Sequence, residues 1–364
     1  MTCASFTHQQ STKRSAPLVS CVTALSLLSP MAAFAQAGAD AAVANFYRGK
    51  TIRIVVGLGA GGSFDITART IARHIGKEIP GNPTVIVENV PGAGSMLALN
   101  QIYNTLPKDG TVIGNVSGPI LSNQLFGNPA ARFDANKMRI LGVPAPIVHM
   151  LVVTKASGVN KLEEMQGANA GKTVKIGSTA PASAIANSAS LAKDAVGLNY
   201  QIVNGYDGFA KIALAMDQGE VNATFNNIDE LRGLYREKVD GGDWKILAQS
   251  SEKPHPRAPN VPVLTALAKD ADSREALRLG AILPQRFGFL YFLAPGVPED
   301  RANALENAFA KTMTDKTFIA SMEQAKLVVD PIAASEVQKM VSEFVNMPEN
   351  MKTRLRPVMF PANR

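Results

Sequence analysis

Cysteine is nearly absent from this chain of 364 residues, and the position of its two copies excludes several kinds of site. Cys3 and Cys21 both fall within the first 35 residues, so the chain beyond them has no thiol. A chain without thiols has no disulfide, no thiolate zinc site and no cysteine nucleophile. The stability of the protein beyond residue 35 must therefore come from packing.

Long apolar runs are also missing, and the one candidate lies near the N-terminus. Lys13 and Arg14 precede a mostly apolar run at residues 21–34, which ends in Ala33-Phe34-Ala35. A basic segment, a short apolar core and a small-residue end are the three parts of a secretory signal. The run falls short of the about 20 apolar residues that a membrane-spanning helix needs. We predict a signal peptide at residues 1–35, cleavage after Ala35 and a location in the periplasm.

A lipoprotein cleavage box at Leu18-Val19-Ser20-Cys21 is the alternative for this segment. Cys21 would then carry the lipid, and only residues 16–19 would form the apolar core before the cut. That core is shorter than the about 7 to 15 residues typical of a signal.

The sequence has no constellation typical of catalysis or of metal binding. Its four histidines, His8, His74, His149 and His255, are not paired with a nucleophile at a recognisable spacing, and Gly-x-Ser-x-Gly is absent. No cluster has the spacing of metal ligands. We predict no catalytic residue, no metal and no cofactor. A hydrolase-like enzyme stays open as an alternative, because a triad assembled in space need not show in sequence.

Basic residues outnumber acidic ones, but they are dispersed. The formal net charge is +7, and it falls to +5 without Lys13 and Arg14, because no acidic residue precedes Asp40. No run resembles a nucleic-acid-binding arm. We therefore expect a solvated basic surface and no nucleic-acid partner.

The most informative segment is a glycine loop between a strand and a helix. Residues 51–56 alternate as a strand, and Gly57-Leu58-Gly59-Ala60-Gly61-Gly62-Ser63-Phe64-Asp65 leads into an amphipathic helix. Glycines allow a close backbone approach, and free N–H groups at a helix N-terminus attract anions. We expect a small anion to bind here.

The same loop satisfies Gly-x-Gly-x-x-Gly at Gly57, Gly59 and Gly62, which leaves a Rossmann-like, nicotinamide-binding enzyme open. Such a unit has an acidic residue about 20 residues after the motif. Glu88 closes the next strand, but it lies 26 residues past Gly62 and belongs to a second turn motif.

Short apolar runs alternate with amphipathic segments along most of the chain, which indicates βαβ units with parallel-type sheets. Two such α/β units, with chain still to follow the second, predict two lobes and at least two crossings between them, near His149 and near Phe289. Residues 36–45 read as an unstructured lead-in, and Phe46-Tyr47 as the anchor of the first strand. The expected strands are residues 51–56, 84–87, 111–116, 149–153, 172–177, 201–203, 223–225, 245–248 and 287–293, and the expected helices are residues 64–79, 95–106, 182–196, 208–218, 299–313 and 316–324.

Two loops resemble the solute-binding receptors of tripartite tricarboxylate transporters, also called the Bug family. Glu88-Asn89-Val90-Pro91-Gly92-Ala93-Gly94 matches the family loop Glu-Asn-x-Pro-Gly-Ala-Gly in full, and residues 57–65 match Pro-Phe-x-Pro-Gly-Gly-x-x-Asp at the glycine pair and the aspartate. The resemblance implies a type II periplasmic binding fold, in which a hinge joins two lobes and the second is inserted into the first. We expect lobe 1 at residues 46–148 and 288–364, and lobe 2 at residues 149–287.

The resemblance also implies the ligand class, small carboxylates held mainly by backbone groups and water. In the first lobe the loop amides would face the ligand, and in the second lobe the helix start at residues 178–183 would do so. Asp65 is also a candidate helix cap, Phe64 a candidate core residue, and Asn226 a candidate turn residue. The expected ligand-binding residues are Leu58, Gly59, Ala60, Gly61, Gly62, Ser63, Phe64, Asp65, Ser117, Ser178, Thr179, Ala182, Ser183, Tyr206 and Asn226.

The resemblance thus predicts a monomeric, non-enzymatic receptor that captures a small carboxylate and delivers it to the membrane permease of a tripartite transporter. Service to a signalling system instead of a transporter stays open, as does the identity of the carboxylate.

Overall fold

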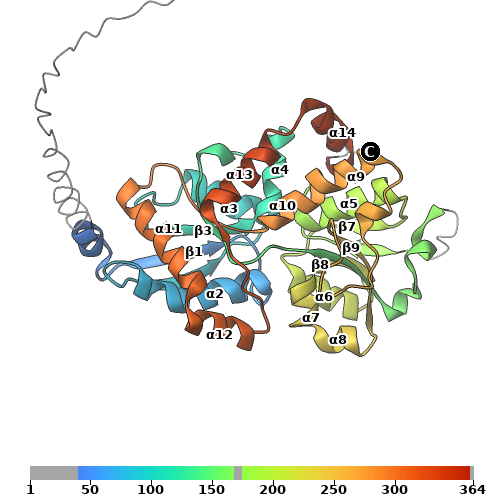
Figure 1. Ribbon diagram of the computed structural model, residues 1–364, viewed down its shortest axis with the longest axis horizontal. Coiled ribbons are helices and arrows are strands. Elements are labelled where there is room, and N and C mark those ends of the chain that lie inside the picture. The colour runs from blue at the N-terminus through green and yellow to red at the C-terminus, as the bar shows by residue number, and fades with distance from the viewer. Residues whose placement is uncertain (1–39, 168–173, 361–364) are drawn as a thin grey trace, which may run out of the picture.

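Two mixed β-sheets lie side by side in the computed structural model, which describes residues 40–167 and 174–360 (Figure 1). The predicted signal peptide lies outside the described residues. Sheet A has the spatial order β11 (Ile332–Ala333), β4 (Arg139–Val143), β10 (Phe289–Leu293), β3 (Val112–Ser117), β1 (Thr51–Val56) and β2 (Thr84–Asn89). Sheet B has the order β7 (Gln201–Val203), β6 (Lys175–Gly177), β8 (Ala223–Asn227), β5 (His149–Thr154) and β9 (Trp244–Ser250).

Helices pack against both sheets. We call sheet A with helices α2, α3, α11, α12 and α13 lobe A, and sheet B with α5, α6, α7 and α8 lobe B. The helices are α2 (Ser63–Ile75), α3 (Met96–Asn104), α4 (Ser122–Leu125), α5 (Ala184–Val196), α6 (Phe209–Asp217), α7 (Ile228–Arg232), α8 (Arg236–Asp240), α9 (Ala271–Leu277), α10 (Leu283–Arg286), α11 (Glu299–Thr314), α12 (Lys316–Gln324), α13 (Ala334–Val345) and α14 (Glu349–Met359).

The parallel strands bring loops together at one edge of each sheet. In sheet A, β1 runs parallel to β2 and β3, so Val56 lies opposite both Asn89 and Asn115. In sheet B, β6 runs parallel to β7 and β8. Loops that follow parallel strands emerge at the same end, so the segments after β1, β2 and β3 gather on one lobe and those after β6, β7 and β8 on the other.

The chain crosses between the two sheets in two short segments, residues 144–148 and residues 287–288, and it passes to the lobe B side once more between α13 and α14. The crossings lie side by side, because a Cβ on Gly288 would lie 2.4 Å from Ile147 Cδ1. Ile147 N also donates a 3.0 Å hydrogen bond to Gln285 O, just before the second crossing. After the second crossing β10 inserts antiparallel between β3 and β4. Both sheets are therefore mixed, with antiparallel strands at the crossings. The lobe boundaries at residues 149 and 288 stay a prediction.

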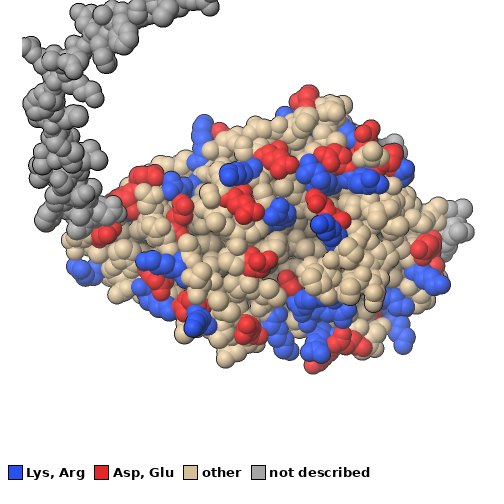
Figure 2. All heavy atoms as spheres, viewed as in Figure 1, with Lys and Arg blue, Asp and Glu red and all other residues tan. Residues whose placement is uncertain are grey.

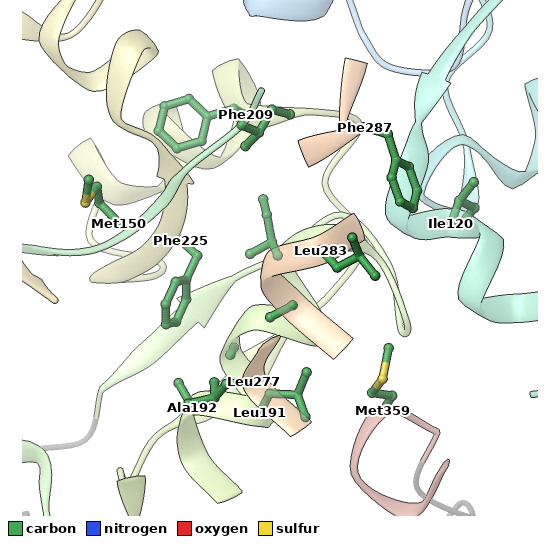
Figure 3. Close-up of a cluster of buried hydrophobic side chains, with 14 of the residues drawn as sticks. Ile120, Met150, Leu191, Ala192, Phe209, Phe225, Leu277, Leu283, Phe287 and Met359 are labelled. Carbon is green, nitrogen blue, oxygen red and sulfur yellow. The ribbon is translucent and has the colours of Figure 1, made fainter. Parts of the chain in front are cut away.

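One apolar core continues from lobe B into lobe A, and a second fills the other side of sheet A. In Figure 3, Leu191 and Phe225 of lobe B belong to the same cluster as Ile120, which follows β3. The second core includes Ile52, Ile54 and Ile71, packed under α11 and α12. These isoleucines occupy the apolar positions of the strand and helix patterns.

Helix α14 lies against α5 and α9 of the sheet B side, at the top of Figure 1. Arg354 forms an ion pair with Asp194 of α5, and Arg356 Nη2 donates a 2.6 Å hydrogen bond to Phe126 O, beside α4. The C-terminal helix thus touches segments on both sides of the crossings.

The prediction of an unstructured lead-in at residues 36–45 is wrong where it falls on described residues. Residues 40–47 form a helix, and Tyr47 lies in it instead of opening a strand. The Tyr47 side chain is fully buried and donates a 3.1 Å hydrogen bond to Gly110 O. Alanine favours helix, and this buried aromatic residue supplies the packing that the composition alone did not indicate.

Surface charge is mixed on the face drawn in Figure 2, where Lys and Arg alternate with Asp and Glu. None of the helices in the described ranges is long and apolar enough to cross a membrane.

Candidate functional site

A cavity of about 60 Å³ lies where the loops of the two lobes meet. A water molecule needs about 10–15 Å³ on this scale, so the cavity as it stands holds only a small solute. Its lining residues come from both lobes and from the first crossing: Leu58, Gly59, Gly62, Ser63, Phe64, Gly94, Ser117, Ile147, His149, Thr179, Ala184, Ile185, Gly208, Phe209, Asn226, Asn227 and Glu230.

Eight of the expected ligand-binding residues line this cavity, and seven do not. Those in the lining are Leu58, Gly59, Gly62, Ser63, Phe64, Ser117, Thr179 and Asn226. Those outside it are Ala60, Gly61, Asp65, Ser178, Ala182, Ser183 and Tyr206. Tyr206 lines a neighbouring surface groove, where its hydroxyl donates a 2.8 Å hydrogen bond to Glu220.

The loop after β1 does not present the free amides expected of it. Gly59 N donates to Asp207 O (2.7 Å), and Gly61 N donates to Asp65 Oδ2 (3.0 Å). Ser63 N donates to Glu230 Oε1 (3.2 Å). The expectation that these groups await an external anion is therefore wrong for three of the loop's five amides, because acceptors within the protein already engage them.

Asp65 holds the loop instead of facing the cavity. Besides accepting from Gly61 N, its carboxylate forms a 2.9 Å ion pair with Arg69 one turn along α2. Burial raises the pKa of Asp65, but the hydrogen bonds from Arg69 and Gly61 outweigh it, and the pKa lies below its usual value. The aspartate is thus an ionised first-turn residue of α2, which suits the helix dipole.

The family-like loop after β2 supports the first loop from behind. Asn89 Nδ2 donates a 3.0 Å hydrogen bond to Leu58 O, and Glu88 pairs with Arg53 of β1 at 3.0 Å. Gly94 has φ +63°, and a Cβ there would lie 2.9 Å from Ser183 Cβ. Glycine at this position therefore allows lobe A to approach lobe B closely.

Glu230 joins the two lobes and was missed in the sequence. It lies on α7 of lobe B, is 2% exposed, and accepts a 2.9 Å hydrogen bond from Ser63 Oγ in addition to the one from Ser63 N. Burial raises the pKa of its carboxyl, against the lowering effect of Ser63 and the neighbouring Asn226 amide. Its sequence context is an acidic residue in the first turn of a helix, which is common on protein surfaces, and nothing local predicts burial.

The start of α5 faces the cavity from lobe B. Ser183 caps this helix by accepting from Ala186 N (3.4 Å), and its hydroxyl also contacts Ser178 Oγ at 3.1 Å. Ala184 and Ile185 follow in the cavity wall, at positions where helix N–H groups have no partner within the helix. Ser178 and Ser183 therefore shape this helix start, and the expected anion site here remains a prediction.

Asn226, the residue before the end of β8, has an unsatisfied amide. Its side chain is 6% exposed and lines the cavity, and its Nδ2 makes no hydrogen bond of ordinary geometry within residues 40–167 and 174–360, although the amide lies close enough to Glu230 to lower the pKa of that carboxyl. Asn227, in contrast, caps α7 by accepting from Asp229 N at 3.3 Å. A buried amide without a partner is destabilising, so Asn226 is a group that a ligand would satisfy.

His149 lines the cavity as a neutral acceptor. Burial lowers its pKa to about 3. Its Nδ1 lies 2.9 Å from Ser188 Oγ, which donates to Ala184 O (3.0 Å) and accepts from Gln285 (2.8 Å). With the single Ser188 proton used in this way, Nδ1 carries the imidazole proton and Nε2 is left as an acceptor. The sequence places His149 in a strand at a crossing, and only that location pointed toward the cleft.

Aromatic and aliphatic side chains complete the walls. Phe64 packs against Phe289 of β10 with ring centroids 4.3 Å apart, and it also lines the cavity. Its contact with a ligand stays a prediction. Ile147, Ile185 and Phe209 add apolar surface. Within the described ranges, no three His, Cys, Asp or Glu side chains gather as metal ligands.

Comparisons with known proteins identify relatives that match most of the chain. A family model described as "Tripartite tricarboxylate transporter family receptor" matches residues 67–354. The UPF0065 protein in the gbd 5'region of Cupriavidus necator is 27% identical over 288 residues, which cover 78% of this chain and 80% of that protein.

Two solved structures resemble the fold at low sequence identity. The periplasmic binding protein BugD is 16% identical with a TM-score of 0.68, over 86% of this chain and 98% of BugD. The R. palustris protein Rpa4515 with adipate is 18% identical with a TM-score of 0.64, over 85% of this chain and 97% of that protein. The predicted periplasmic binding fold is thereby confirmed.

Proposed function

The chain belongs to the tripartite tricarboxylate transporter receptor family, and from this membership we propose that it captures a small organic carboxylate and delivers it to a membrane permease. Members of this family are receptors, and we extend that role to this protein in place of the exported dehydrogenase or hydrolase that the sequence left open.

The observation that carries the proposal is the unsatisfied Asn226 amide beside the start of α5. A buried Nδ2 without a partner among the described residues lines the same cavity as Ala184 and Ile185. Amide donors and helix N-termini both favour carboxylate oxygens. A charged group at a helix terminus gains about 0.3–1 kcal/mol when exposed and up to about 2 kcal/mol when partly buried.

The relatives support the same ligand class. Rpa4515, which shares the fold, holds adipate, a dicarboxylate. A micromolar site requires about 8 kcal/mol, so several such contacts and burial of the solute between the lobes must act together.

Capture requires the lobes to open, because loops of both lobes line the cavity and hydrogen bonds join these loops. The bonds from Gly59 to Asp207 and from Ser63 to Glu230 join the lobes, and residues 144–148 and 287–288 are the segments about which they would turn. A ligand shifts such an equilibrium only if it binds the closed form more tightly than the open one. We propose that the receptor acts as a monomer in the periplasm after cleavage behind Ala35.

The test is a thermal-shift and calorimetry panel on the chain from Gln36 onward, unfolded and refolded first to remove any carried ligand. A carboxylate present at about 100 times its dissociation constant should add about 2.7 kcal/mol to the free energy of unfolding. Asn226→Ala should abolish the shift, whereas Asn350→Ala on the exposed start of α14 should keep it.

The same panel includes the alternatives. Stabilisation by NAD but by no carboxylate would favour the dinucleotide-binding enzyme, and turnover of p-nitrophenyl esters would favour the hydrolase. Either result overturns the receptor proposal. N-terminal sequencing of the protein from the periplasmic fraction tests the cleavage site separately.

A further inference from the structure

Glu230 is a buried acid in a cavity proposed to receive an acid. Its side chain is 2% exposed, and none of the ion pairs within residues 40–167 and 174–360 includes it. The neighbouring Asp229, by contrast, has its own cation in Arg257 at 2.6 Å. A buried carboxylate without a cation is strongly destabilised unless it stays protonated or acquires a positive partner.

The two hydrogen bonds from Ser63 satisfy only part of this carboxylate. A carboxylate offers about four acceptor positions, and Ser63 N and Ser63 Oγ use one on each oxygen. The rest of the group lines the cavity. At least one acceptor position therefore stays open to an occupant.

The other groups around the cavity include both donors and acceptors, and the Asn226 amide lies beside the Glu230 carboxyl. Asn226 Nδ2 and the start of α5 provide donors, which suit an anionic group. Glu230 and the Nε2 of His149 provide acceptors, which suit a hydrogen-bond donor or a cation. A dicarboxylate would place its second charge against Glu230, which is unfavourable in a site closed to water.

We infer that the ligand of this receptor is a zwitterion, a carboxylate that also carries a protonated amine, and that Glu230 is the residue that selects the ammonium group. This inference rests on the proposed carboxylate-receptor function and narrows it. The carboxylate of the ligand binds at Asn226 and the start of α5, and its ammonium group donates to Glu230. Ser63 holds Glu230 in position from the other lobe, so closure brings the acid into the site.

The experiment compares ligands that differ only in the group at one end. The pairs are β-alanine and succinate, 4-aminobutyrate and glutarate, and 5-aminovalerate and adipate, measured by calorimetry on the wild-type chain from Gln36 onward. In at least one pair the amino acid should bind at least about tenfold more tightly than the dicarboxylate of the same length, because burial of a charge pair is favoured over burial of two like charges. The best length reports the separation between the two subsites.

Variants of Glu230 test the role of the residue. Glu230→Gln should weaken the best amino acid at least about tenfold and strengthen its dicarboxylate partner, since it removes the charge but keeps the size. Glu230→Asp keeps the charge and should keep the preference for the amino acid, although with lower affinity. Glu323→Gln, an exposed acid on α12, is the matched control and should change neither affinity.

The number of protons released on binding gives a second measurement. This number would not change if Glu230 had only a structural role. Calorimetry in two buffers of different ionisation enthalpy should detect proton release when the amino acid binds wild-type protein at a pH at which Glu230 is partly protonated. Glu230→Gln should show none from this site. Both variants are first checked for folding by circular dichroism.

Three results are distinguishable. If the amino acids bind best and Glu230→Gln reverses the ranking, the inference stands. If dicarboxylates bind wild-type protein as tightly as or more tightly than amino acids, the inference is overturned while the carboxylate receptor survives. If no member of the panel binds wild-type protein or either variant, the proposed function itself fails.

Discussion

Gly59 donates a 2.7 Å hydrogen bond from its backbone nitrogen to the carbonyl oxygen of Asp207, and this bond joins the two lobes. Gly59 belongs to the loop after β1, and Asp207 to the segment between β7 and α6. A Cβ on Gly59 would lie 3.0 Å from that oxygen, which is closer than an ordinary contact. The absence of a side chain is thus what lets the two loops close on each other.

Gly59→Ala should hold the lobes apart. The added methyl group crowds the Asp207 carbonyl, and overpacking of this kind costs about 1–3 kcal/mol. Because the crowding exists only in the closed form, apparent ligand affinity should fall about 5- to 100-fold, and small-angle X-ray scattering should give a larger radius of gyration. Gly219→Ala is the control, because φ is +76° there but no atom lies within 4 Å of the new Cβ. Gly219→Ala should lower stability without changing affinity. An equal loss of affinity in both variants would contradict the steric explanation given for Gly59→Ala.

Glu230→Gln should change how stability depends on pH. Burial raises the pKa of the Glu230 carboxyl, so the folded chain keeps this proton at pH values where the unfolded chain has lost it. This group therefore opposes folding increasingly as the pH rises from the ordinary glutamate value through the raised one. Glutamine does not titrate, so the stability of the variant minus that of wild type should grow with pH over this window.

Urea unfolding at several pH values between 4 and 8 measures this difference in stability. The test is the slope of the difference plotted against pH. The titratable groups near Glu230 are His149 in the same cavity and Tyr235, whose pKa is raised by burial and to a smaller extent by the Glu230 charge. Both remain in the variant, so their contributions cancel in the difference. A difference that stays constant with pH would show that Glu230 is ionised in the folded protein at no cost.

The fold was largely predictable because it is encoded in local patterns. The strand at residues 51–56 and the helix at residues 316–324 have the predicted bounds, and most other elements differ by a few residues at their ends. The strands β4 and β11 and the helices α4, α7, α8, α9, α10, α13 and α14 are not among the expected elements. β4 is short and fully stabilised by its neighbours in the sheet, so its conformation depends on distant residues that a local pattern does not contain.

The sequence predicted the loop residues of the site but not the distant residues that they contact. Ser63 was expected in it because it opens a helix after a glycine turn, but its partner Glu230 lies 167 residues away. Tertiary packing decides whether the acceptor at a helix N-terminus is an external anion or a side chain from another lobe. The glycine loop predicted acceptors for its amides, and the acceptors found for three of them are groups of the protein itself, so binding of an external anion here stays a prediction.

Asn226→Leu should separate binding from folding. The two side chains share a branched skeleton of four heavy atoms, and the change removes a buried Nδ2 that makes no hydrogen bond of ordinary geometry among the described residues. Removing an unsatisfied buried donor should leave the free energy of unfolding unchanged or raise it by about 1–2 kcal/mol. Affinity for the carboxylate should fall at least about tenfold, as calorimetry will show. Asn227→Ala makes the opposite change, because it removes the cap of α7 and should cost about 0.5–2 kcal/mol of stability.

His149→Asn should flatten the acid side of the stability profile. Burial lowers the pKa of His149 to about 3 from an ordinary value of 6.5, so between these values the unfolded chain binds a proton that the folded chain does not. Stability therefore falls as the pH is lowered through this window, by about 2 kcal/mol between pH 6.5 and pH 5 from this residue alone. Asparagine keeps a donor near the position of Nδ1 for Ser188 but does not titrate.

Urea unfolding of wild type and His149→Asn at pH 7, 6 and 5 should give curves that diverge with acidification, and the variant should lose less stability. The effect of His149 on the pH dependence of stability has the opposite sign to that of Glu230, whose raised pKa favours the folded state as the pH falls. The two variants should therefore change the dependence of stability on pH in opposite directions. His255→Asn serves as a comparison, because His255 lies partly exposed in a loop outside the cavity lining and its pKa is lowered by a weaker burial effect. Parallel curves for wild type and His149→Asn would mean that the folded protein admits a proton to His149, and the neutral acceptor assigned to the cavity would then be wrong.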